Sequence, residues 1–393
     1  MHMARIYKMN SFLVLILSFI KLYEGFSNSS TIDSHLFDIN ITTTLKPIDR
    51  NYEIVVNWGQ NLGGNEMALN AYCDSKAYDI IIINTVDIFF DDQNADNLPG
   101  FNLANHCNGM FEGNFKSYLQ CYSIGEDIKG CQKNGKKILL SLGGGTRWNG
   151  FSSASQAKLF AHNLWNLFMG GTHATRTFGD AVIDGINIDL RFGEASWFDD
   201  FFTEMRTLMV SDKSKVYLIT SSPSCAFPDF RLGKVYVSSG TKINSLYVNF
   251  GDNSCSFGKE EDFSRVLDSW MSLIPTIFIG IPSSQTASYS ANHYIEPSKL
   301  PILFSKYIHL QKQIGGILLS DVTYDDKNII NGTKYSDIVG QLLHPDTYTL
   351  SNKKSTVAGG SFDKKSGKSS THTSEAATVI ICFLVCFILN LTS

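Results

Sequence analysis

Short runs of β-branched and other apolar residues recur along the chain, with segments of helical length between them. These runs predict eight buried strands, at Glu53–Asn57, Asp79–Asn84, Lys137–Leu142, Val182–Leu190, Val216–Ser221, Ser245–Phe250, Thr276–Ile281 and Gly316–Ser320. The segments between them predict helices, among them Glu66–Cys73, Gln156–Phe168, Trp197–Met209, Asp262–Ser272, Lys299–Gln313 and Tyr335–Leu343. The strands are too continuously apolar for a half-exposed sheet, so they indicate a parallel sheet covered on both faces. Eight strand–helix units favour a closed (β/α)8 barrel over an open doubly wound sheet.

Composition and charge narrow the classes of protein to which this chain can belong. The 393 residues are 43% hydrophobic and include 27 Phe and 16 Tyr. A chain this apolar can bury a large core, which excludes disorder for most of its length. Its 33 basic and 37 acidic side chains leave a net charge of −4. That balance excludes a polybasic surface, so we expect no nucleic-acid partner.

Residues 1–26 have the pattern of a secretory signal peptide. Arg5 and Lys8 form a positive leader, Phe12–Ile20 is apolar, and Gly25–Ser27 offers a cleavage region. The alternative is a membrane anchor, but the apolar run is too short to cross about 30 Å of hydrocarbon. A polar leader follows at 27–50. We therefore expect a secreted protein with a single barrel domain at 51–345.

The other end of the chain has the pattern of a lipid-anchor signal. A polar linker at 346–375 contains the small residues Gly359–Ser361, and the apolar tail Ala376–Leu389 follows it. Small residues, a polar spacer and a terminal hydrophobic tail direct attachment of a GPI anchor, with removal of residues 376–393. Ser366 or Gly367 would also serve as the attachment residue. The alternative is a short true membrane tail. We expect anchoring at the cell surface, to the plasma membrane or the cell wall.

Sequons and cysteines fit an oxidising compartment. Candidate N-glycosylation sites are Asn28, Asn40 and Asn331, whereas the sequon at Asn390 would be lost with the tail. Two of the eight cysteines lie in that tail, which leaves Cys73, Cys107, Cys121, Cys131, Cys225 and Cys255. Six cysteines allow 15 pairings. They lack the close paired spacing of a zinc site, so we expect disulfides, no metal and no cofactor.

The fourth predicted strand carries the chain's most informative polar residues. It reads Asp184-Gly-Ile-Asn187-Ile-Asp189-Leu-Arg191. Side chains alternate along a strand, so positions 187, 189 and 191 share one face. Polar groups inside a barrel are costly unless they are paired. A satisfied polar network in the barrel core and a functional site at the strand end both explain them. In a (β/α)8 barrel, chemistry lies at the carboxyl ends of the strands.

This strand resembles the DGxDxDxE signature of glycoside hydrolase family 18. The resemblance is to the plant class III (hevamine-like) and yeast cell-separation chitinases, and it covers roughly Glu53 to Leu343. Further matching segments, in chain order, are Trp58-Gly-Gln-Asn61, Lys137-Ile-Leu-Leu-Ser-Leu-Gly143-Gly144, Phe178-Gly-Asp-Ala-Val-Ile-Asp184-Gly, Ser222-Pro-Ser-Cys225-Ala-Phe-Pro228-Asp, Val248-Asn-Phe250, Gly280-Ile-Pro282 and Tyr324-Asp-Asp-Lys-Asn328. The resemblance implies the (β/α)8 fold and the disulfides Cys73–Cys131, Cys107–Cys121 and Cys225–Cys255.

The resemblance also implies a chemistry. Members cleave β-1,4-linked N-acetylglucosamine polymers with retention, using the substrate's acetamide as the nucleophile. The last glutamate of the signature protonates the leaving oxygen, and the preceding aspartate orients the acetamide. A tyrosine beyond the sixth strand binds the acetamide oxygen, and a tryptophan at the eighth strand forms the floor of the sugar site. Trp58, Gln60 and Asn249 are further candidates for substrate binding by position.

This sequence departs from the family at most of those positions. Arg191 replaces the general acid, and Asn187 replaces the middle aspartate, while Asp189 is retained. Gly251 stands where the tyrosine is expected and Ser320 where the tryptophan is expected. A guanidinium stays protonated at any usable pH, so it cannot serve as an acid–base catalyst.

Two local alternatives bear on this departure. Glu194 lies three residues beyond Arg191, but a loop carboxylate up to about 10 Å away is a poor substitute for a positioned acid. We expect Arg191 to form an ion pair with Asp189 instead. Aromatic residues that could line a groove are Trp58, Trp148, Phe192, Trp197 and Tyr247, although packing is the favoured interpretation for each.

Two hypotheses of function follow from these residues. The first is a chitinase-like protein without chitin hydrolysis, which binds a cell-wall glycan or a protein partner in a retained groove. The resemblance includes inactive members that act as lectins, storage proteins or glycosidase inhibitors. The second is a weak or altered chitinase that still uses Asp189. We favour the first, because several positions of the catalytic set are replaced together.

Overall fold

The computed structural model describes residues 52–93, 95–113, 118–251, 255–288 and 290–344. The predicted signal peptide, polar leader, linker and tail lie outside these residues, as do the sequons at Asn28, Asn40 and Asn390. Within the described residues, no helix combines the length and the apolar character needed to span a bilayer.

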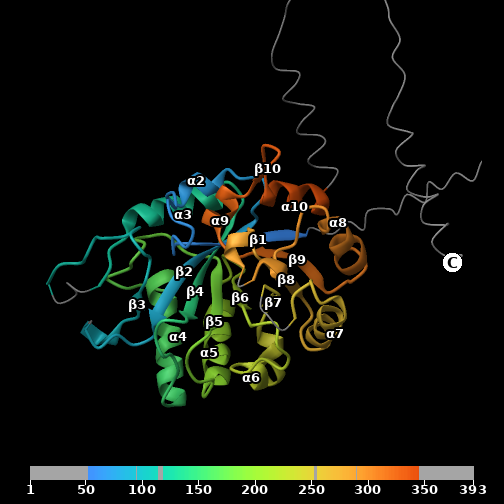
Figure 1. Cartoon of the computed structure of the whole chain (residues 1–393). Coiled ribbons are helices and arrows are strands. Elements are labelled where there is room, and N and C mark those ends of the chain that lie inside the picture. Colours follow the sequence, from blue (N-terminus) through green and yellow to red (C-terminus); the bar gives the residue numbers. More distant parts are fainter. Residues whose placement is uncertain (1–51, 94, 114–117, 252–254, 289, 345–393) are drawn as a thin grey trace, which may run out of the picture. The chain divides into compact units, whose positions relative to one another are not determined.

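Eight parallel strands close into a barrel, which confirms the predicted fold class (Figure 1). They are β1 (Glu53–Trp58), β2 (Ile80–Ile88), β4 (Lys137–Gly144), β5 (Gly185–Leu190), β6 (Leu218–Ser221), β7 (Ser245–Asn249), β8 (Ile277–Ile281) and β9 (Ile314–Leu319). Closure is achieved because β1 pairs with both β2 and β9. The short β3 (Gly100–Phe101) runs antiparallel to the end of β2. A small hairpin, β10 (Ile329–Ile330) and β11 (Thr333–Lys334), lies after the barrel.

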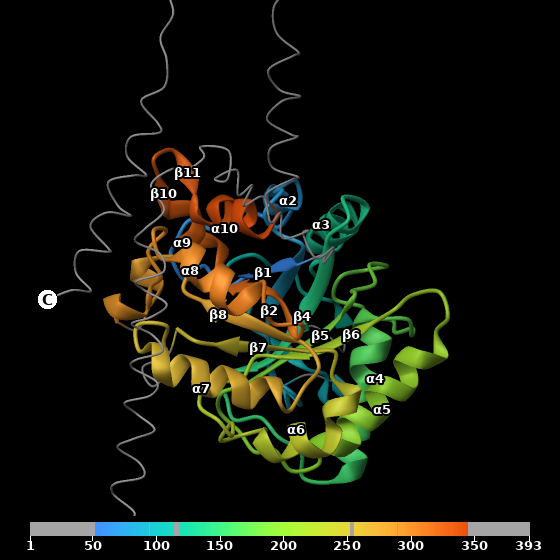
Figure 2. The same ribbon diagram turned by 90° about the vertical axis from the view of Figure 1, so that its right-hand side faces the viewer.

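Helices follow the strands and lie outside the barrel, as Figure 2 shows for α4 to α7. Their bounds are α2 (Asn70–Cys73), α3 (Tyr122–Lys133), α4 (Ala154–Phe168), α5 (Phe198–Ser211), α6 (Gly233–Ser239), α7 (Glu260–Met271), α8 (Leu300–Leu303), α9 (Val322–Lys327) and α10 (Tyr335–Leu343). Each strand-to-strand connection along the barrel contains one of these helices. Parallel neighbours require such crossovers, since a tight turn cannot connect them.

Alternation along the strands divides the core into two clusters. Side chains that point inward fill the barrel; they are Val55, Ile80, Ile82, Leu139, Tyr247, Phe278 and Leu318. Side chains of the opposite parity, such as Ile186 and Ile188 of β5, pack against the helices. A group of phenylalanines joins α4 and α5 to the loop after β2: Phe89, Phe151, Phe160, Phe198 and Phe201. The polar residues of β5 have the inward parity, so they lie at the top of the inner cluster.

Two predicted helices are shorter than expected. Within Glu66–Cys73 only Asn70–Cys73 is helical, because the Glu66 carboxylate accepts hydrogen bonds from the backbone N–H groups of Gly59 and Asn61. Those contacts hold the segment as a loop folded back on β1. Within Lys299–Gln313, α8 ends at Leu303 and continues as a π-helical turn, Phe304–Ile308.

Three helices, α3, α6 and α9, lie outside the helices that we named from the sequence. In α3 the buried residues Ile124, Ile128 and Cys131 share one face, which is an amphipathic signal. The helices α6 and α9 have only seven and six residues. Such lengths give too few turns for periodicity to stand out.

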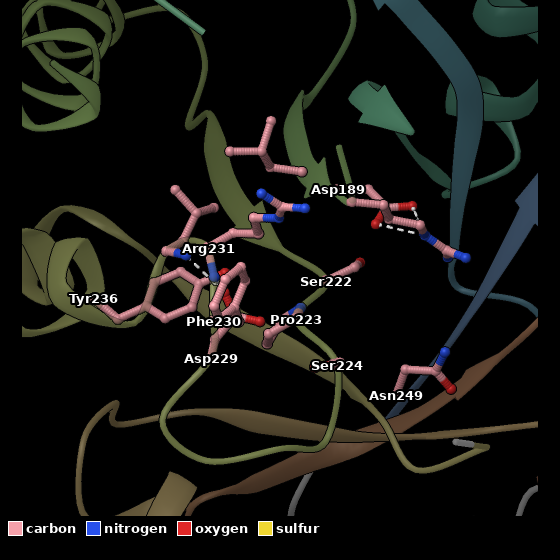
Figure 3. Close-up of a pocket in the computed structure, with 12 residues that line it drawn as sticks. Asp189, Ser222, Pro223, Ser224, Asp229, Phe230, Arg231, Tyr236 and Asn249 are labelled. Atoms are coloured by element: carbon pink, nitrogen blue, oxygen red, sulfur yellow. Dashed lines mark hydrogen bonds and ion pairs between the residues drawn. The ribbon is translucent and has the colours of Figure 1, made fainter. Parts of the chain in front are cut away.

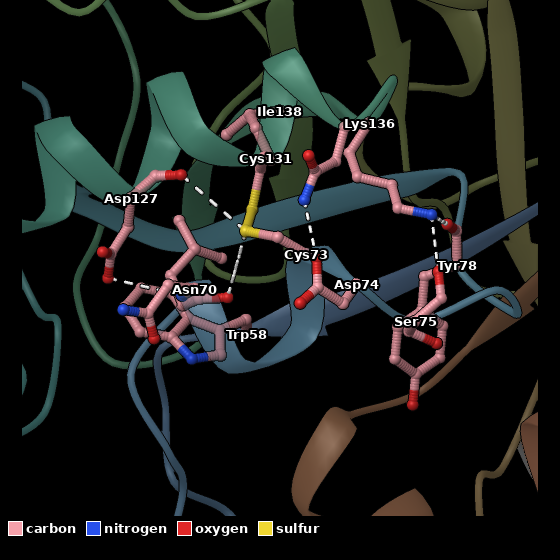
Figure 4. Close-up of a disulfide and its surroundings, with 12 residues drawn as sticks. Trp58, Asn70, Cys73, Asp74, Ser75, Tyr78, Asp127, Cys131, Lys136 and Ile138 are labelled. Atoms are coloured by element: carbon pink, nitrogen blue, oxygen red, sulfur yellow. Dashed lines mark hydrogen bonds between the residues drawn. A yellow bond between two sulfur atoms is a disulfide. The ribbon is translucent and has the colours of Figure 1, made fainter.

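All three implied disulfides are present. They are Cys73–Cys131, Cys107–Cys121 and Cys225–Cys255. Figure 4 shows the first, which joins the end of α2 to α3 beside the barrel. The third fixes the loop after β6, and the Cys225 carbonyl also accepts a hydrogen bond from the indole of Trp270 (3.1 Å).

Candidate functional site

The site forms at the carboxyl end of β5, where neighbouring strands place polar groups in register. Asn187 lies opposite Ser141 of β4 and Thr220 of β6, and Asp189 lies opposite Gly143. A Cβ atom at Gly143 would come within 2.5 Å of the Asp189 carbonyl oxygen, and the φ angle there is +112°. Only glycine fits this position without strain. The close approach of β4 therefore fixes the backbone that carries Asp189.

Asn187 is held in a satisfied polar network. It is 1% exposed. Its amide oxygen accepts a hydrogen bond from the hydroxyl of Thr220 (2.9 Å), and its amide nitrogen donates to the hydroxyl of Ser222 (3.0 Å). Buried polar groups are stable when they are paired in this way. The network holds a neutral side chain where the family signature has an aspartate.

Asp189 and Arg191 form the ion pair that we expected. The Nε atom of Arg191 lies 2.9 Å and 3.0 Å from the two carboxylate oxygens of Asp189. The Asp189 side chain is 15% exposed, whereas that of Arg191 is 63% exposed. The guanidinium thus covers the carboxylate from the solvent side. Both oxygens of the Asp189 carboxylate therefore face a permanent positive charge.

Glu194 lies apart from this pair, in the loop that follows β5. The side chain is exposed and accepts a hydrogen bond from the Ser196 hydroxyl (2.6 Å). Its backbone N–H donates to the carbonyl of Asn149 (2.9 Å). Glu194 does not line the cavity that contains Asp189. In the structure Glu194 is therefore an exposed loop carboxylate outside the cavity lining.

A cavity of about 330 Å³ opens beside Asp189 and Arg191 (Figure 3). The loop between β6 and α6 provides most of its wall; the residues are Ser222, Pro223, Ser224, Asp229, Phe230, Arg231 and Leu232. Tyr236 and Asn249 complete the wall, so the candidate Asn249 lies at this cavity. The sequence pattern did not single out Asp229, Phe230 or Arg231. The family-matching segment from Ser222 to Asp229 was the one feature of the sequence that pointed to this loop.

Gly251 stands at the position expected for the acetamide-binding tyrosine, and glycine has no side chain that could bind an acetamide. The N–H of Gly251 donates to the amide oxygen of Asn249 (3.0 Å), and its carbonyl contacts Nδ1 of His293 (3.1 Å). A Cβ atom here would lie 3.1 Å from Cγ of Pro282. The space beside Gly251 is therefore narrow, and Pro282 occupies part of it.

Small polar groups occupy the position expected for the tryptophan floor. The Ser320 hydroxyl accepts a hydrogen bond from the N–H of Ser283 (3.0 Å) and donates to its hydroxyl (3.2 Å). The Ser320 carbonyl accepts from the side chain of Asn57 (3.0 Å). Serine and asparagine here present hydrogen-bonding groups and no flat apolar surface.

Two candidate substrate residues hold the loop after β1 in place. Trp58 is 1% exposed, packs against His106 with ring centroids 4.5 Å apart, and donates to the Met67 carbonyl. It fills the outer core and presents no surface to a groove. Gln60 donates to the carbonyls of Asn84 (2.9 Å) and Asn102 (2.7 Å), so it joins the loops after β1 and β3.

The remaining aromatic candidates divide into packing and exposed residues. Tyr247 is 1% exposed and contacts Phe278 inside the barrel, so it is a core residue. Trp148, Phe192 and Trp197 are between 46% and 56% exposed, on the loops after β4 and β5. An isolated bridge between Asn149 and Gly193 joins these two loops. Trp148, Phe192 and Trp197 thus present exposed apolar side chains on loops that follow the strand ends.

Asp321 is a buried acid next to Ser320. It is 1% exposed and caps α9 by accepting hydrogen bonds from the backbone N–H and the hydroxyl of Thr323. Burial raises the pKa of this carboxyl from 3.8 to about 6, and the nearby Glu66 acts in the same direction. The folded protein therefore binds this proton more tightly than the unfolded chain does.

We predict that Asp321→Asn removes a pH dependence of stability. The raised pKa destabilises the wild-type fold above about pH 6, and this cost disappears as the pH falls below about 4. Asparagine still caps the helix without a charge. The free energy of unfolding of the variant relative to wild type should rise by up to about 3 kcal/mol between pH 4 and pH 7. Urea unfolding at four pH values measures it, and parallel stability curves would refute the assignment.

The remaining predicted glycan site, Asn331, is accessible. It is exposed at the turn between β10 and β11, with a φ angle of 51°, and Gly332 follows with a φ angle of 80°. Asparagine and glycine are the residues that favour such a turn. The sequon therefore lies on a surface hairpin, with Asn331 exposed.

Comparison with known proteins places this geometry in a family. The profile described as "Glycosyl hydrolases family 18" matches residues 53–340. "Chitinase 3" of Candida albicans is 36% identical over 287 residues, which cover 70% of this chain and 47% of that protein. The chain spans about half the length of the first curated relatives it matches.

Two solved structures show the same barrel. The ICChI chitinase from Ipomoea carnea has a TM-score of 0.63 and 28% identity, over 74% of this chain and 99% of that one. The xylanase and alpha-amylase inhibitor protein XAIP-II from Scadoxus multiflorus has a TM-score of 0.61 and 26% identity, over 73% and 97%. The family profile, the sequence relatives and the closed barrel agree, and the chain belongs to glycosyl hydrolase family 18.

Proposed function

We propose that this chitinase-like protein binds a cell-wall glycan in the retained groove and does not hydrolyse chitin. The observation that carries the proposal is the contact of Arg191 with both carboxylate oxygens of Asp189. Position 191 is where the family signature has its general acid. A protonated carboxyl must give up its proton to the leaving oxygen and recover it later, which a guanidinium cannot do.

The charge at position 191 also opposes the reaction. Hydrolysis passes through an oxocarbenium-like transition state, which carries positive charge. A cation beside it raises the barrier instead of lowering it, because electrostatic stabilisation requires the opposite sign. Asn187 offers no negative charge in compensation, since its amide is neutral. Asp189, which would have to orient the acetamide, is paired with the cation.

Glycan binding requires less of the site than catalysis does. The cavity beside Asp189 presents hydroxyl, amide and charged groups on a rigid set of strand ends and a disulfide-fixed loop. Polar groups of this kind fix the orientation of a ligand in a mostly preformed pocket. The glycine and the serine at positions 251 and 320 weaken the case for N-acetylglucosamine at the central subsite. The ligand of this proposal is therefore a cell-wall glycan other than chitin.

Two alternatives can be tested against this proposal. One is a weak or altered chitinase, supported by the retained Asp189 and by relatives named as chitinases. The other is a protein partner, supported by the likeness to a protein named as an inhibitor of xylanase and alpha-amylase. The first predicts turnover that disappears in Asp189→Ala. The second predicts inhibition of a partner glycosidase.

We also propose that the mature protein is secreted, N-glycosylated and held at the cell surface by a GPI anchor. Support comes from the signal-like residues 1–26, the sequons and the pattern of small, polar and apolar residues at 359–389. Phosphatidylinositol-specific phospholipase C should release the protein from intact cells. If the protein stayed in both the membrane fraction and the wall fraction after this treatment, that result would contradict a GPI anchor in the membrane.

We predict retention on a polysaccharide without product release. Purified protein is incubated with insoluble chitin, β-1,3-glucan, mannan and an acidic wall polysaccharide, and the bound fraction and the reducing ends are measured. At least one polymer should retain the protein with no new reducing ends. Asn249→Ala removes a polar group from the cavity and should lower retention. Retention by none of the polymers would contradict the glycan proposal and favour a protein partner.

A further inference from the structure

The charges of the site differ from those that the family signature provides. Two positions that are acidic in the signature are Asn187 and Arg191 here, so negative charge is lost at both and positive charge is gained at one. The Arg191 side chain is 63% exposed at the cavity wall. The loss of negative charge at these two positions removes a repulsion that the family signature would exert on an anionic ligand.

A second guanidinium lines the same cavity. Arg231 comes from the loop after β6 and is partly exposed. Its Nη1 atom donates to the carbonyl of Gly193 (2.9 Å), and its guanidinium lies over the ring of Phe230, 5.1 Å from the centroid. Within the described part of the chain, the guanidinium makes this one hydrogen bond, although it has five N–H donors. The side chain is thus positioned, with donors left to offer a ligand.

The two carboxylates of the cavity already have partners. Asp189 is paired with Arg191. One oxygen of Asp229 accepts hydrogen bonds from the backbone N–H groups of Arg231 (2.9 Å) and Leu232 (2.6 Å). Burial raises the pKa of the Asp229 carboxyl, and these hydrogen bonds and the nearby Arg231 act in the opposite direction. These acids therefore oppose an incoming anion less than two unpaired carboxylates would.

The cavity also carries the features of a sugar site. Phe230 is 86% exposed at the edge of the cavity, and the guanidinium of Arg231 lies near its ring (Figure 3). An exposed ring of this kind can pack against the apolar face of a pyranose. Ser222, Ser224 and Asn249 add hydroxyl and amide groups along the wall. The volume of about 330 Å³ lies at the lower end of the range for small-molecule pockets, roughly 300–1,000 Å³.

From these contacts we infer that the cavity binds a sugar unit that carries a carboxylate, a uronic acid within a β-1,4-linked oligosaccharide. Arg231 binds the carboxylate, Arg191 adds a second positive charge at the same cavity wall, and Phe230 packs against the ring. Arginine suits this task because its planar fork matches the two oxygens of a carboxylate. The inference rests on the proposed function, since it names the class of glycan that the groove takes.

The test compares an anionic trisaccharide with its neutral counterpart. The full chain is titrated by calorimetry with β-1,4-linked triglucuronate and with cellotriose, in which each carboxylate is a hydroxymethyl group. We expect triglucuronate to bind at least about tenfold more tightly than cellotriose. The difference should shrink when the salt concentration rises from about 0.05 M to about 0.5 M. Equal affinity for the two sugars would overturn the inference.

Variants assign the effect to this cavity. Arg191→Gln and Arg231→Gln should each weaken triglucuronate binding about tenfold and leave cellotriose binding nearly unchanged. Asp189→Asn should strengthen it, because the competing carboxylate is removed. Arg265→Gln is the matched control, since Arg265 is an exposed arginine on α7 that pairs with Asp262. A loss of the same size in Arg265→Gln, or no loss in either cavity variant, would contradict the assignment.

Failure of the inference and failure of the proposed function give different results. Chitotriose is titrated alongside, and reducing ends are measured in every mixture. Binding of a neutral sugar without cleavage, together with no binding of triglucuronate, overturns only the uronate inference. Cleavage of chitotriose by wild type overturns the proposed function. Specific binding of triglucuronate without cleavage supports both.

Discussion

Restoring the four replaced positions is expected to create hydrolysis of chitin oligosaccharides. The variant combines Asn187→Asp, Arg191→Glu, Gly251→Tyr and Ser320→Trp. Glu at position 191 restores a general acid, and Asp at position 187 restores a negative charge. Tyr at position 251 restores a partner for the acetamide, and Trp at position 320 restores the floor of the sugar site. A general acid alone contributes roughly 10²–10⁴ in rate, so release of products from chitotetraose should exceed the wild-type background by at least that factor.

The structure indicates the order in which to build this variant. Asn187→Asp and Arg191→Glu keep the strand and remove the ion pair that holds Asp189. Gly251→Tyr needs a small movement of Pro282, whose Cγ atom lies 3.1 Å from the position that the new Cβ atom would take. Ser320→Trp must displace the hydrogen bonds with Ser283. The double variant is therefore made first, and circular dichroism checks the fold at each step.

Controls tie the gained activity to the site. Adding Asp189→Ala to the fourfold variant should abolish the activity, because no carboxylate then orients the acetamide. Arg265→Glu, the same charge change on the exposed surface of α7, should create none. A correctly folded fourfold variant with no activity would show that the barrel has lost more than these side chains.

Removing the disulfide Cys73–Cys131 is expected to give a large loss of stability. The bond closes a loop with a sequence separation of 58 residues, and both cysteines are buried. In the chain-entropy model, a loop of this length contributes about 4 kcal/mol by restricting the unfolded state. Cys73→Ala with Cys131→Ala should lower the free energy of unfolding by about that amount, with a further loss from packing.

The shorter disulfide provides the comparison. Cys107–Cys121 closes a loop with a separation of 14 residues, for which the same model gives about 3 kcal/mol. Urea unfolding of the two double-alanine variants measures both losses under the same conditions. A smaller loss for Cys73–Cys131 than for Cys107–Cys121 would contradict the entropic ranking.

The strand order and the barrel could be predicted because strands buried on both faces leave continuous apolar runs. The same alternation placed Asn187 and Asp189 on the inner face. The ends of the strands were less predictable where pairing with a distant segment of the chain extends a strand. Strand β2 extends to Ile88 because Val86 and Ile88 pair with the antiparallel β3.

The wall of the cavity could not be predicted in the same way. The loop from Ser222 to Leu232 has no periodicity, and its path depends on long-range contacts. Two contacts fix that path: the hydrogen bond from the Arg231 guanidinium to the Gly193 carbonyl, and the disulfide Cys225–Cys255. For Trp58 the sequence suggested a role that the structure does not support. Its place in a family motif suggested substrate binding, whereas its burial gives it a packing role.

Hydrolysis of chitotetraose by the purified wild-type protein bears most directly on the role of Arg191. Products are separated and quantified between about pH 4 and pH 8, the range in which carboxyl and imidazole groups titrate. With a cation at position 191, no product should appear above the blank at any pH. Robust cleavage that is lost in Asp189→Ala or Glu194→Ala would contradict the role assigned to Arg191.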